Sequence, residues 1–227
     1  REIGHRIISI HRFSDPLKAV KEAEAIATGG GNTWKLLKNI RENKLIGAVR
    51  EKVDSGTPYI GWSAGSNVAC PTIMTTNDMP VVQPSSFRAF NLIPFQINPH
   101  YLDANPEGHA GETREQRIIE FIEINHDVYV VGLREGTMLE VRKDNIRLIG
   151  PKKARIFKNQ DKNDYLILNY DNQWTKYFLS LKPKSKIYFI SHRPLPLNKN
   201  GIFFKNNKLY FQENKKIIGD FSIKDFF

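Results

Sequence analysis

The chain has 227 residues, of which 40% are hydrophobic and 26% charged, and its formal net charge is +10. No apolar run approaches the roughly 18 residues that a membrane-spanning helix needs, and no secretory signal opens the chain, so we expect a soluble globular protein without a membrane partner. The single cysteine, Cys70, excludes an intramolecular disulfide and favours a reducing, cytoplasmic setting.

The charge is unevenly distributed along the chain. Residues 1–150 carry equal numbers of acidic and basic side chains, whereas residues 151–227 carry the whole excess of positive charge and most of the aromatic side chains. Such a change in composition marks a change of module. We therefore predict a catalytic domain at residues 1–158 and a basic, aromatic extension at residues 159–227.

The first part of the chain alternates between strand and helix patterns. In chain order we expect a strand at residues 6–10, a helix at 15–23, a strand at 24–28, a helix that opens at Asn32 or Thr33, and a helix at 45–53. Asp15 is a good N-cap, and Pro16 suits the first helical position. The alternation predicts an α/β fold with a doubly wound, mostly parallel sheet and helices on both faces.

Further along, the pattern continues and then changes. We expect a strand at residues 92–97, an amphipathic helix at 112–124, and a buried strand at 128–133 with a hairpin partner at 138–141. Short apolar runs then alternate with polar turns, at residues 201–204, 209–211 and 217–218. That pattern predicts a β-meander, so the extension is expected to be β-rich.

The most informative motif is Gly61-Trp62-Ser63-Ala64-Gly65, directly after the apolar run 58–60. A G-x-S-x-G sequence behind a strand is typical of a nucleophile elbow, a sharp strand-to-helix turn that exposes the serine hydroxyl. The flanking glycines are needed where neighbouring chain passes too close for a Cβ. Ser63 is therefore a candidate nucleophile, although ordinary turns also match this pattern.

A serine nucleophile needs a base, a group that orients the base, and an oxyanion hole. His100 is the favoured base because it follows a predicted strand end, where a parallel sheet presents its active-site loops. The orienting acid is either Asp78, which gives the chain order Ser, Asp, His, or Glu135, just past a buried strand. The alternative interpretations are a turn residue for Asp78 and a surface ion pair for Glu135.

The glycine run 29–31 between a strand and a helix fits no nucleotide-binding motif, but its N–H groups suit an oxyanion. The amide of Ala64 would be a second donor. His100, Asp103, His109 and Glu112 match no metal-binding spacing, so we expect no metal and no cofactor. Arg114 and Arg117, at the start of a predicted helix, either bind a substrate carboxylate or form Glu/Arg pairs on a solvated face.

Several longer runs carry a family resemblance. Residues 61–67, 69–73 and 75–80 closely resemble the peptidase E family, as do residues 96–100, 106–109 and 111–117. The likeness extends from about residue 7 to residue 157. The family comprises cytoplasmic serine peptidases that hydrolyse dipeptides with an N-terminal aspartate. Its fold is similar to that of class I glutamine amidotransferases and needs no metal.

The resemblance implies roles for individual residues. Ser63 falls on the family nucleophile and His100 on its general base, and Gly31 and Ala64 fall on the oxyanion hole. Asp78 falls where the orienting carboxylate of the family is placed, while Glu135 matches a glutamate also proposed for that role. The resemblance also implies that Arg114 binds the aspartyl carboxylate of the substrate.

Two departures from the family pattern leave an alternative open. The chain begins after most of the strand–helix–strand unit that opens the family, and it continues past the usual family end, so we expect the extension to pack against the gap or to add a β-module. The alternative is a catalytically impaired binding protein whose basic tail contacts nucleic acid or an acidic partner. In that case Tyr165, Tyr170, Trp174, Tyr177 and Phe178 could stack on bases. We favour the dipeptidase over nucleic-acid binding; a homodimer is compatible with the sequence.

Overall fold

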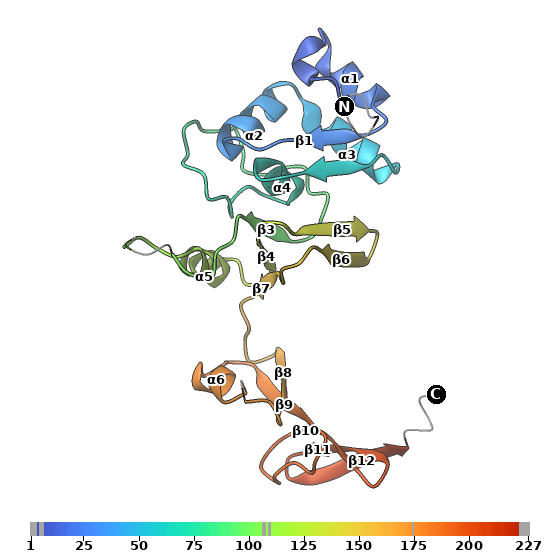
Figure 1. Ribbon diagram of the computed structural model, residues 1–227, viewed down its shortest axis with the longest axis vertical. Helices are drawn as coiled ribbons and strands as arrows, with labels where there is room; N and C mark the ends of the chain where they lie inside the picture. The colour runs from blue at the N-terminus through green and yellow to red at the C-terminus, as the bar shows by residue number, and fades with distance from the viewer. Residues whose placement is uncertain (1–3, 5–6, 106–107, 109, 174, 223–227) are drawn as a thin grey trace. The chain divides into compact units, whose positions relative to one another are not determined.

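The computed structural model describes residues 4, 7–105, 108, 110–173 and 175–222. The chain divides into two compact units, residues 1–159 and residues 160–227. Both units mix helices with strands, so the predicted α/β class is confirmed at that level (Figure 1). Within the described ranges, none of the helices is long and apolar enough to cross a membrane.

The described residues of the first unit form five α-helices, one 3-10 helix and seven strands. The helical elements are η1 (Ile10–Arg12), α1 (Pro16–Glu22), α2 (Thr33–Glu42), α3 (Leu45–Asp54), α4 (Ala64–Ala69) and α5 (Arg114–Ile124). The strands are β1 (Ile26–Thr28), β2 (Tyr59–Gly61), β3 (Gln96–Pro99), β4 (Val130–Leu133), β5 (Met138–Arg142), β6 (Asn145–Ile149) and β7 (Arg155–Phe157).

Side-chain caps mark where three helices of this unit begin. The Asp15 carboxylate accepts from the Lys18 N–H at α1, and the Asn32 side chain accepts from the Lys35 N–H at α2. At α5, Thr113 and Gln116 form a reciprocal capping box. Each cap satisfies main-chain donors that the first helical turn leaves free, which is why the sequence signals located these starts well.

The parallel strands of this unit belong to separate sheets. β1 pairs with β2 in parallel, and β3 pairs in parallel with β4, whose other edge carries the antiparallel β7. Among the described residues these pairs form separate hydrogen-bonded sheets, so the doubly wound sheet that the sequence predicts stays a prediction. Helix α4 contacts β1, β2 and β3, so it links the two parallel pairs (Figure 1).

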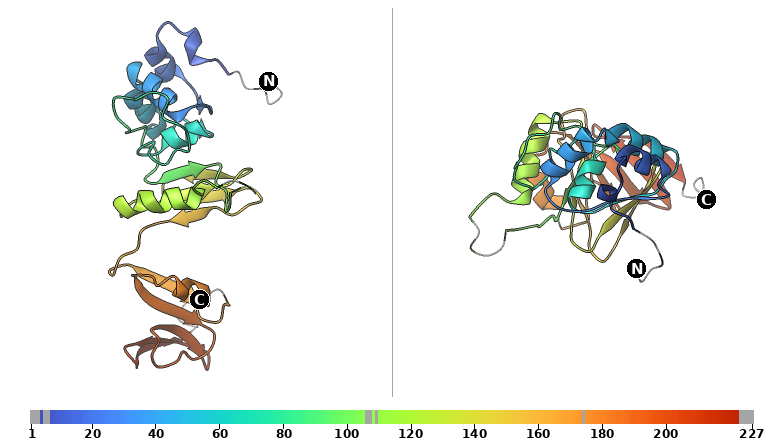
Figure 2. Two further views of the ribbon diagram at one scale, coloured as in Figure 1. Left: turned by 90° about the vertical axis from the view of Figure 1, so that its left-hand side faces the viewer. Right: turned by 90° about the horizontal axis from the view of Figure 1, so that it is seen from above.

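The core of the first unit is divided among several clusters. Helices α1 to α4 enclose one apolar cluster, in which Leu37 and Val68 are fully buried. Successive residues of β4 face opposite sides: Val130 packs with Ile118 of α5, and Val131 packs with Ile97 of β3. This alternation follows the two-residue period of a strand. Helix α5 therefore covers one face of β4 (Figure 2).

Two sequence predictions for this unit are wrong. Residues 7–9 form no strand and are followed by η1; Ile7 is 81% exposed, so nothing buries it as a strand would. Residues 138–141, the predicted hairpin partner of β4, do not pair with it, because β3 and β7 occupy both of its edges. Instead β5 pairs with β6 across a tight turn.

Where it is described, the second unit consists of a five-stranded sheet and one helix. Its elements are β8 (Tyr165–Asn169), α6 (Thr175–Ser180), β9 (Lys186–Ser191), β10 (Gly201–Lys205), β11 (Lys208–Glu213) and β12 (Lys216–Ser222). β8, β9 and β10 run parallel, whereas β10, β11 and β12 form an antiparallel meander. One face packs Leu168, Phe189 and Phe203 into a small core.

Candidate active site

Ser63 lies on a strained turn between β2 and α4. Its main chain has φ 55° and ψ −118°, a combination that side-chain-bearing residues rarely adopt. A Cβ on Gly65 would stand 1.9 Å from the main-chain oxygen of Thr28, and one on Gly61 would stand 2.5 Å from the oxygen of Gly65. The glycines at both ends of the motif are therefore required by close main-chain approach, as a nucleophile elbow needs.

His100 directly follows β3 and faces Ser63. Its Nε2 is 2.9 Å from the Ser63 Oγ, although the two residues are 37 positions apart in the chain. The His100 main chain also has a positive φ, 55°, so the chain turns sharply as it leaves the fully buried strand β3. The pair has the separation that proton transfer from hydroxyl to imidazole requires.

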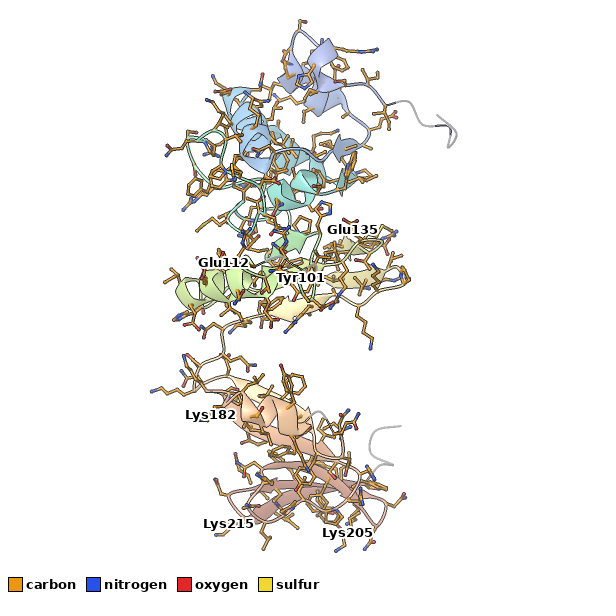
Figure 3. All side chains as sticks on the ribbon, turned by 60° about the vertical axis from the view of Figure 1, so that its left-hand side comes forward. Tyr101, Glu112, Glu135, Lys182, Lys205 and Lys215 are labelled. Atoms are coloured by element: carbon orange, nitrogen blue, oxygen red, sulfur yellow. The ribbon has the colours of Figure 1, made fainter. Side chains whose placement is uncertain are left out.

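Glu135 provides the carboxylate on the other imidazole nitrogen. Its Oε1 forms a short contact with His100 Nδ1. The register of the sheet explains the meeting: Pro99 is opposite Leu133, and the Tyr101 N–H donates to the Leu133 oxygen at 3.1 Å. The residues that follow these two strand ends, His100 and Glu135, therefore leave the sheet side by side; Figure 3 labels Glu135 and Tyr101 in this region.

Arg134 anchors the turn that carries Glu135. Its guanidinium forms a two-pronged ion pair with Asp103, in which Nε donates to Oδ2 at 2.9 Å, and lies 5.4 Å from the centre of the Tyr101 ring. Hydrogen bonding to Arg134 lowers the pKa of Asp103. Tyr101 and Asp103 follow His100 closely in the chain, and Arg134 directly precedes Glu135. The contacts of Arg134 therefore hold the segment after His100 next to the turn that carries Glu135.

Asp78 lies in a different setting. Its Oδ2 accepts from both the main-chain N–H and the hydroxyl of Thr33, at 2.7 and 2.5 Å. In the described part of the chain, no hydrogen bond joins Asp78 to His100. Of the two acids that the sequence left open, Glu135 contacts the imidazole and Asp78 contacts the start of α2.

The glycine run lies against Ser63. A Cβ on Gly30 would be 3.1 Å from the Ser63 Cβ, and one on Gly29 would be 3.1 Å from the Trp62 ring. Gly31 has φ 121°, a conformation that favours glycine. Ala64 is the first residue of α4, so its N–H has no partner within the helix. Both of the predicted oxyanion donors thus belong to segments that contact Ser63 or adjoin it.

Arg114 is the first residue of α5 and is partly buried. Desolvation and the neighbouring Arg117 lower its pKa, whereas the Asp78 charge raises it. Arg117 pairs with Glu112 at 3.4 Å, but no ion pair of Arg114 is found among the described residues. A partly desolvated guanidinium without an ion pair is suited to binding an anion.

Two other histidines have polar partners of their own. His126 is bound to the main-chain oxygen of Glu123, and His192 is paired with Asp171 in the second unit. Burial raises the pKa of the Cys70 thiol to about 12, so Cys70 is a neutral core residue rather than a second nucleophile. No metal-binding group of three or more ligands is present within the described ranges. His5 and His109 lie outside those ranges.

Three buried amide side chains that the sequence pattern does not identify lie close in the chain to Ser63 or His100. Asn67, Gln96 and Asn98 are 2–3% exposed, and each leaves its side-chain oxygen without a hydrogen bond. Tyr59 donates from its hydroxyl to the Gly65 oxygen at 2.8 Å and thereby supports the elbow. Asn67 and Asn98 lie within the runs that carry the family resemblance, which was the available signal.

The aromatic residues proposed for base stacking are divided within the second unit. Tyr165 alternates along β8 with Leu166 and Leu168, which face the small core and α6. Tyr165 therefore lies on the opposite side of the sheet from α6, which carries Tyr177 and Phe178. Trp174 is outside the described residues. This separation does not favour one continuous stacking surface.

Comparison with known proteins gives three findings. A model of Peptidase family S51 matches residues 1–149. Peptidase E of a Nostoc species is 53% identical over 166 residues, and the match covers 73% of this chain and 69% of the relative. Peptidase E of Salmonella typhimurium is 51% identical over 156 residues, and the match covers 69% of this chain and 68% of the relative. A solved structure of a candidate peptidase E protein from Listeria monocytogenes has a TM-score of 0.49 at 23% identity, and the match covers 60% of this chain and 64% of that one.

Proposed function

This chain belongs to peptidase family S51, a family of hydrolases, and we propose that it is a serine dipeptidase that hydrolyses dipeptides with an N-terminal aspartate. The observation that carries the proposal is the chain of contacts from Ser63 Oγ through His100 to Glu135. A hydroxyl, an imidazole and a carboxylate in this order form the constellation of serine hydrolases on many unrelated folds.

The chemistry follows from the order of these contacts. His100 Nε2 accepts the proton of the Ser63 hydroxyl as Oγ attacks the peptide carbonyl, and the N–H groups of Gly31 and Ala64 stabilise the oxyanion. His100 then donates the proton to the leaving amine. An acyl-enzyme remains on Ser63, and water attacks it with His100 again acting as base.

We assign the orienting role to Glu135. A carboxylate on Nδ1 selects the tautomer that leaves Nε2 free to accept the serine proton, and it stabilises the imidazolium that forms. The contact between Glu135 Oε1 and His100 Nδ1 supports this assignment. Asp78, whose carboxylate is bound to Thr33, is not the orienting acid in this proposal.

Arg114 is the proposed site for the aspartyl side chain of the substrate. A guanidinium binds a carboxylate with paired, charge-assisted hydrogen bonds, which an asparagine substrate cannot provide. Partial burial would strengthen the discrimination because water competes less for the charges. The lowered pKa of Arg114 and its lack of an ion pair in the described ranges support this role.

We also propose that β1–β2 and β3–β4 are two parts of a doubly wound sheet like that of class I glutamine amidotransferases. Both pairs are parallel, and α4, which follows the nucleophile, contacts both. In such sheets the ligand binds beyond the carboxyl ends of the strands. Ser63 and His100 follow the carboxyl ends of β2 and β3 in this way.

The test is hydrolysis of Asp-Leu, Asn-Leu, Glu-Leu and N-acetyl-Asp-Leu by the purified full chain. We expect Asp-Leu to be cleaved far faster than the other three, and Ser63→Ala to lose at least about a thousandfold in kcat. Arg114→Gln should lower the preference for Asp-Leu over Asn-Leu, with Arg50→Gln, on α3, as a control. Asp-Leu cleavage that survives Ser63→Ala would overturn the proposal.

A further inference from the structure

Residues 75–79, which we call the clasp, run between the two segments that would form the catalytic site. On one side lies β3, which ends immediately before His100. On the other side lies the glycine run together with the first residues of α2. The clasp is hydrogen-bonded to both sides. Its hydrogen bonds therefore connect the strand end before His100 to the glycine run that precedes α2.

Two residues of the clasp, Thr75 and Asn77, hold β3. The Thr75 hydroxyl donates to the Ile97 oxygen at 3.0 Å, and the Asn77 side chain donates to the Pro99 oxygen at 2.9 Å. The Asn98 side chain in turn donates to the Thr75 oxygen and to Asn77 Oδ1, both at 2.9 Å. These bonds fix the clasp to the strand end from which His100 projects.

The even-numbered residues hold the start of α2. Asp78 accepts from the Thr33 N–H and hydroxyl, and the Thr76 hydroxyl bonds to the Thr33 hydroxyl at 3.0 Å. The Trp34 indole N–H donates to the Asp78 main-chain oxygen at 3.1 Å. Through these contacts, the clasp fixes the point where the glycine run enters the helix.

We propose that Asp78 is a positioning residue that acts through Thr33 to hold the Gly31 amide in the oxyanion hole. The inference rests on the proposed function. Gly30 is packed against Ser63, and Thr33 is held by Asp78, so the intervening Gly31 and Asn32 have little freedom. The Asn32 side chain is itself tied to the Met79 oxygen at 2.8 Å. Because Gly31 has a positive φ and no side chain, its orientation depends on these neighbours.

A carboxylate suits this position for a physical reason. The N-terminal turn of a helix leaves N–H groups without partners and carries a partial positive charge. Asp78 satisfies the Thr33 N–H with a charge-assisted bond, which is stronger than a bond to a neutral acceptor. An asparagine of the same shape keeps the volume but loses the charge.

The test is a double-mutant cycle with Asp78→Asn and Thr33→Val, measured as kcat and KM for Asp-Leu. We expect each single variant to lower kcat by about 10- to 100-fold through misplacement of the oxyanion donor, with little change in KM. The double variant should be hardly worse than Asp78→Asn alone, because both changes break the same connection. Thr33→Ser, which keeps the hydroxyl, should restore most of the rate.

Two controls separate the positioning role of Asp78 from a general effect of charge and from a role as the acid on His100. Asp54→Asn removes an exposed acidic charge at the end of α3 and should leave kcat unchanged. The pH dependence of kcat should keep its midpoint in Asp78→Asn, because the acid on His100 is intact. Wild-type kcat in Asp78→Asn, additive losses in the cycle, or a shifted pH profile would each overturn the positioning role. Loss of activity in Ser63→Ala tests the proposed function independently, whatever the cycle shows.

Discussion

Non-glycine residues with positive φ occur in both units; some of them form hairpin turns and others do not. In the second unit, Asn206 and Asn207 form the two-residue turn between β10 and β11, and Asn214 and Lys215 form the next one. Two positive φ angles are what a tight hairpin turn requires, so no chemistry needs to be invoked there. Figure 3 labels Lys205 and Lys215 beside these turns.

In the first unit, two such residues are Ser63 and His100, and neither lies in a hairpin. Each follows the end of a parallel strand, and their side chains contact one another. A strained main chain persists only where its surroundings hold it, and such strain is concentrated at active sites. The comparison teaches that a positive φ indicates function when the strained residue brings a reactive group to a partner, and indicates only a turn otherwise.

A large effect on kcat is expected at the partner of His100. Glu135→Gln keeps the size of the side chain but removes the charge that would stabilise the imidazolium, so we expect kcat to fall by about 10³- to 10⁴-fold. Glu140→Gln, on β5, is the matched control and should stay near wild type. Steady-state kinetics with Asp-Leu decides the matter. If kcat of Glu135→Gln stayed within tenfold of wild type, the contact of Glu135 with His100 would not explain the strained main chain at His100.

A pair of glycine substitutions compares the two units directly. The Cβ of Gly65→Ala would stand 1.9 Å from the Thr28 oxygen, and that of Gly201→Ala would stand 2.0 Å from the Phe189 oxygen. Both variants must shift main chain, at a cost of about 3 kcal/mol or more. Hydrogen exchange should locate the damage at the elbow in one and at β10 in the other. Gly65→Ala should abolish hydrolysis, whereas full activity in that variant would contradict the elbow assignment.

Replacing Ser63 by alanine and by glycine separates strain from chemistry. Both variants lack the hydroxyl and should be inactive. Glycine tolerates φ 55° and ψ −118°, but alanine does not, so Ser63→Gly should be more stable than Ser63→Ala by about 1 kcal/mol. Urea denaturation of the two variants measures the difference. Equal stabilities would show that the turn at Ser63 relaxes in the absence of the hydroxyl.

The smallest expected effect lies in a turn of the second unit. Lys215 has φ 67° at the second position of its two-residue turn, where glycine is preferred. Lys215→Gly should therefore slow hydrogen exchange in β11 and β12 by an amount equivalent to about 0.5–1 kcal/mol, without changing hydrolysis. Faster exchange in these strands would show that the lysine side chain contributes more than its main-chain strain costs.

The sequence predicted the local features of the site better than the long-range ones. The glycine spacing around Ser63 and the caps at Asp15 and Asn32 are local signals, and the corresponding turn and helices form there. The choice between Asp78 and Glu135 could not be made locally. It depends on which residues of β3 and β4 lie opposite one another, and a strand pattern does not encode that register.

The strand partners were the other part that local patterns could not supply. Residues 138–142 have the alternation of a strand, but their pairing with β6 follows from the occupation of both edges of β4. The parallel pairing of β8 with β9 and of β9 with β10 likewise gave no signal in the sequence of the extension. Propensity indicates that a segment is extended, while its neighbour is chosen by the rest of the fold.

The most direct test of the central claim is covalent labelling of the full chain with a fluorophosphonate, followed by peptide mass mapping. We predict one phosphonyl group per chain, on Ser63, and we expect the labelled protein to have lost all hydrolysis of Asp-Leu. Labelling should be slowed by at least about a hundredfold in His100→Ala, because the imidazole is needed to remove the hydroxyl proton. An active enzyme whose label lies on another residue, or whose Ser63 reacts equally fast without His100, would contradict the account.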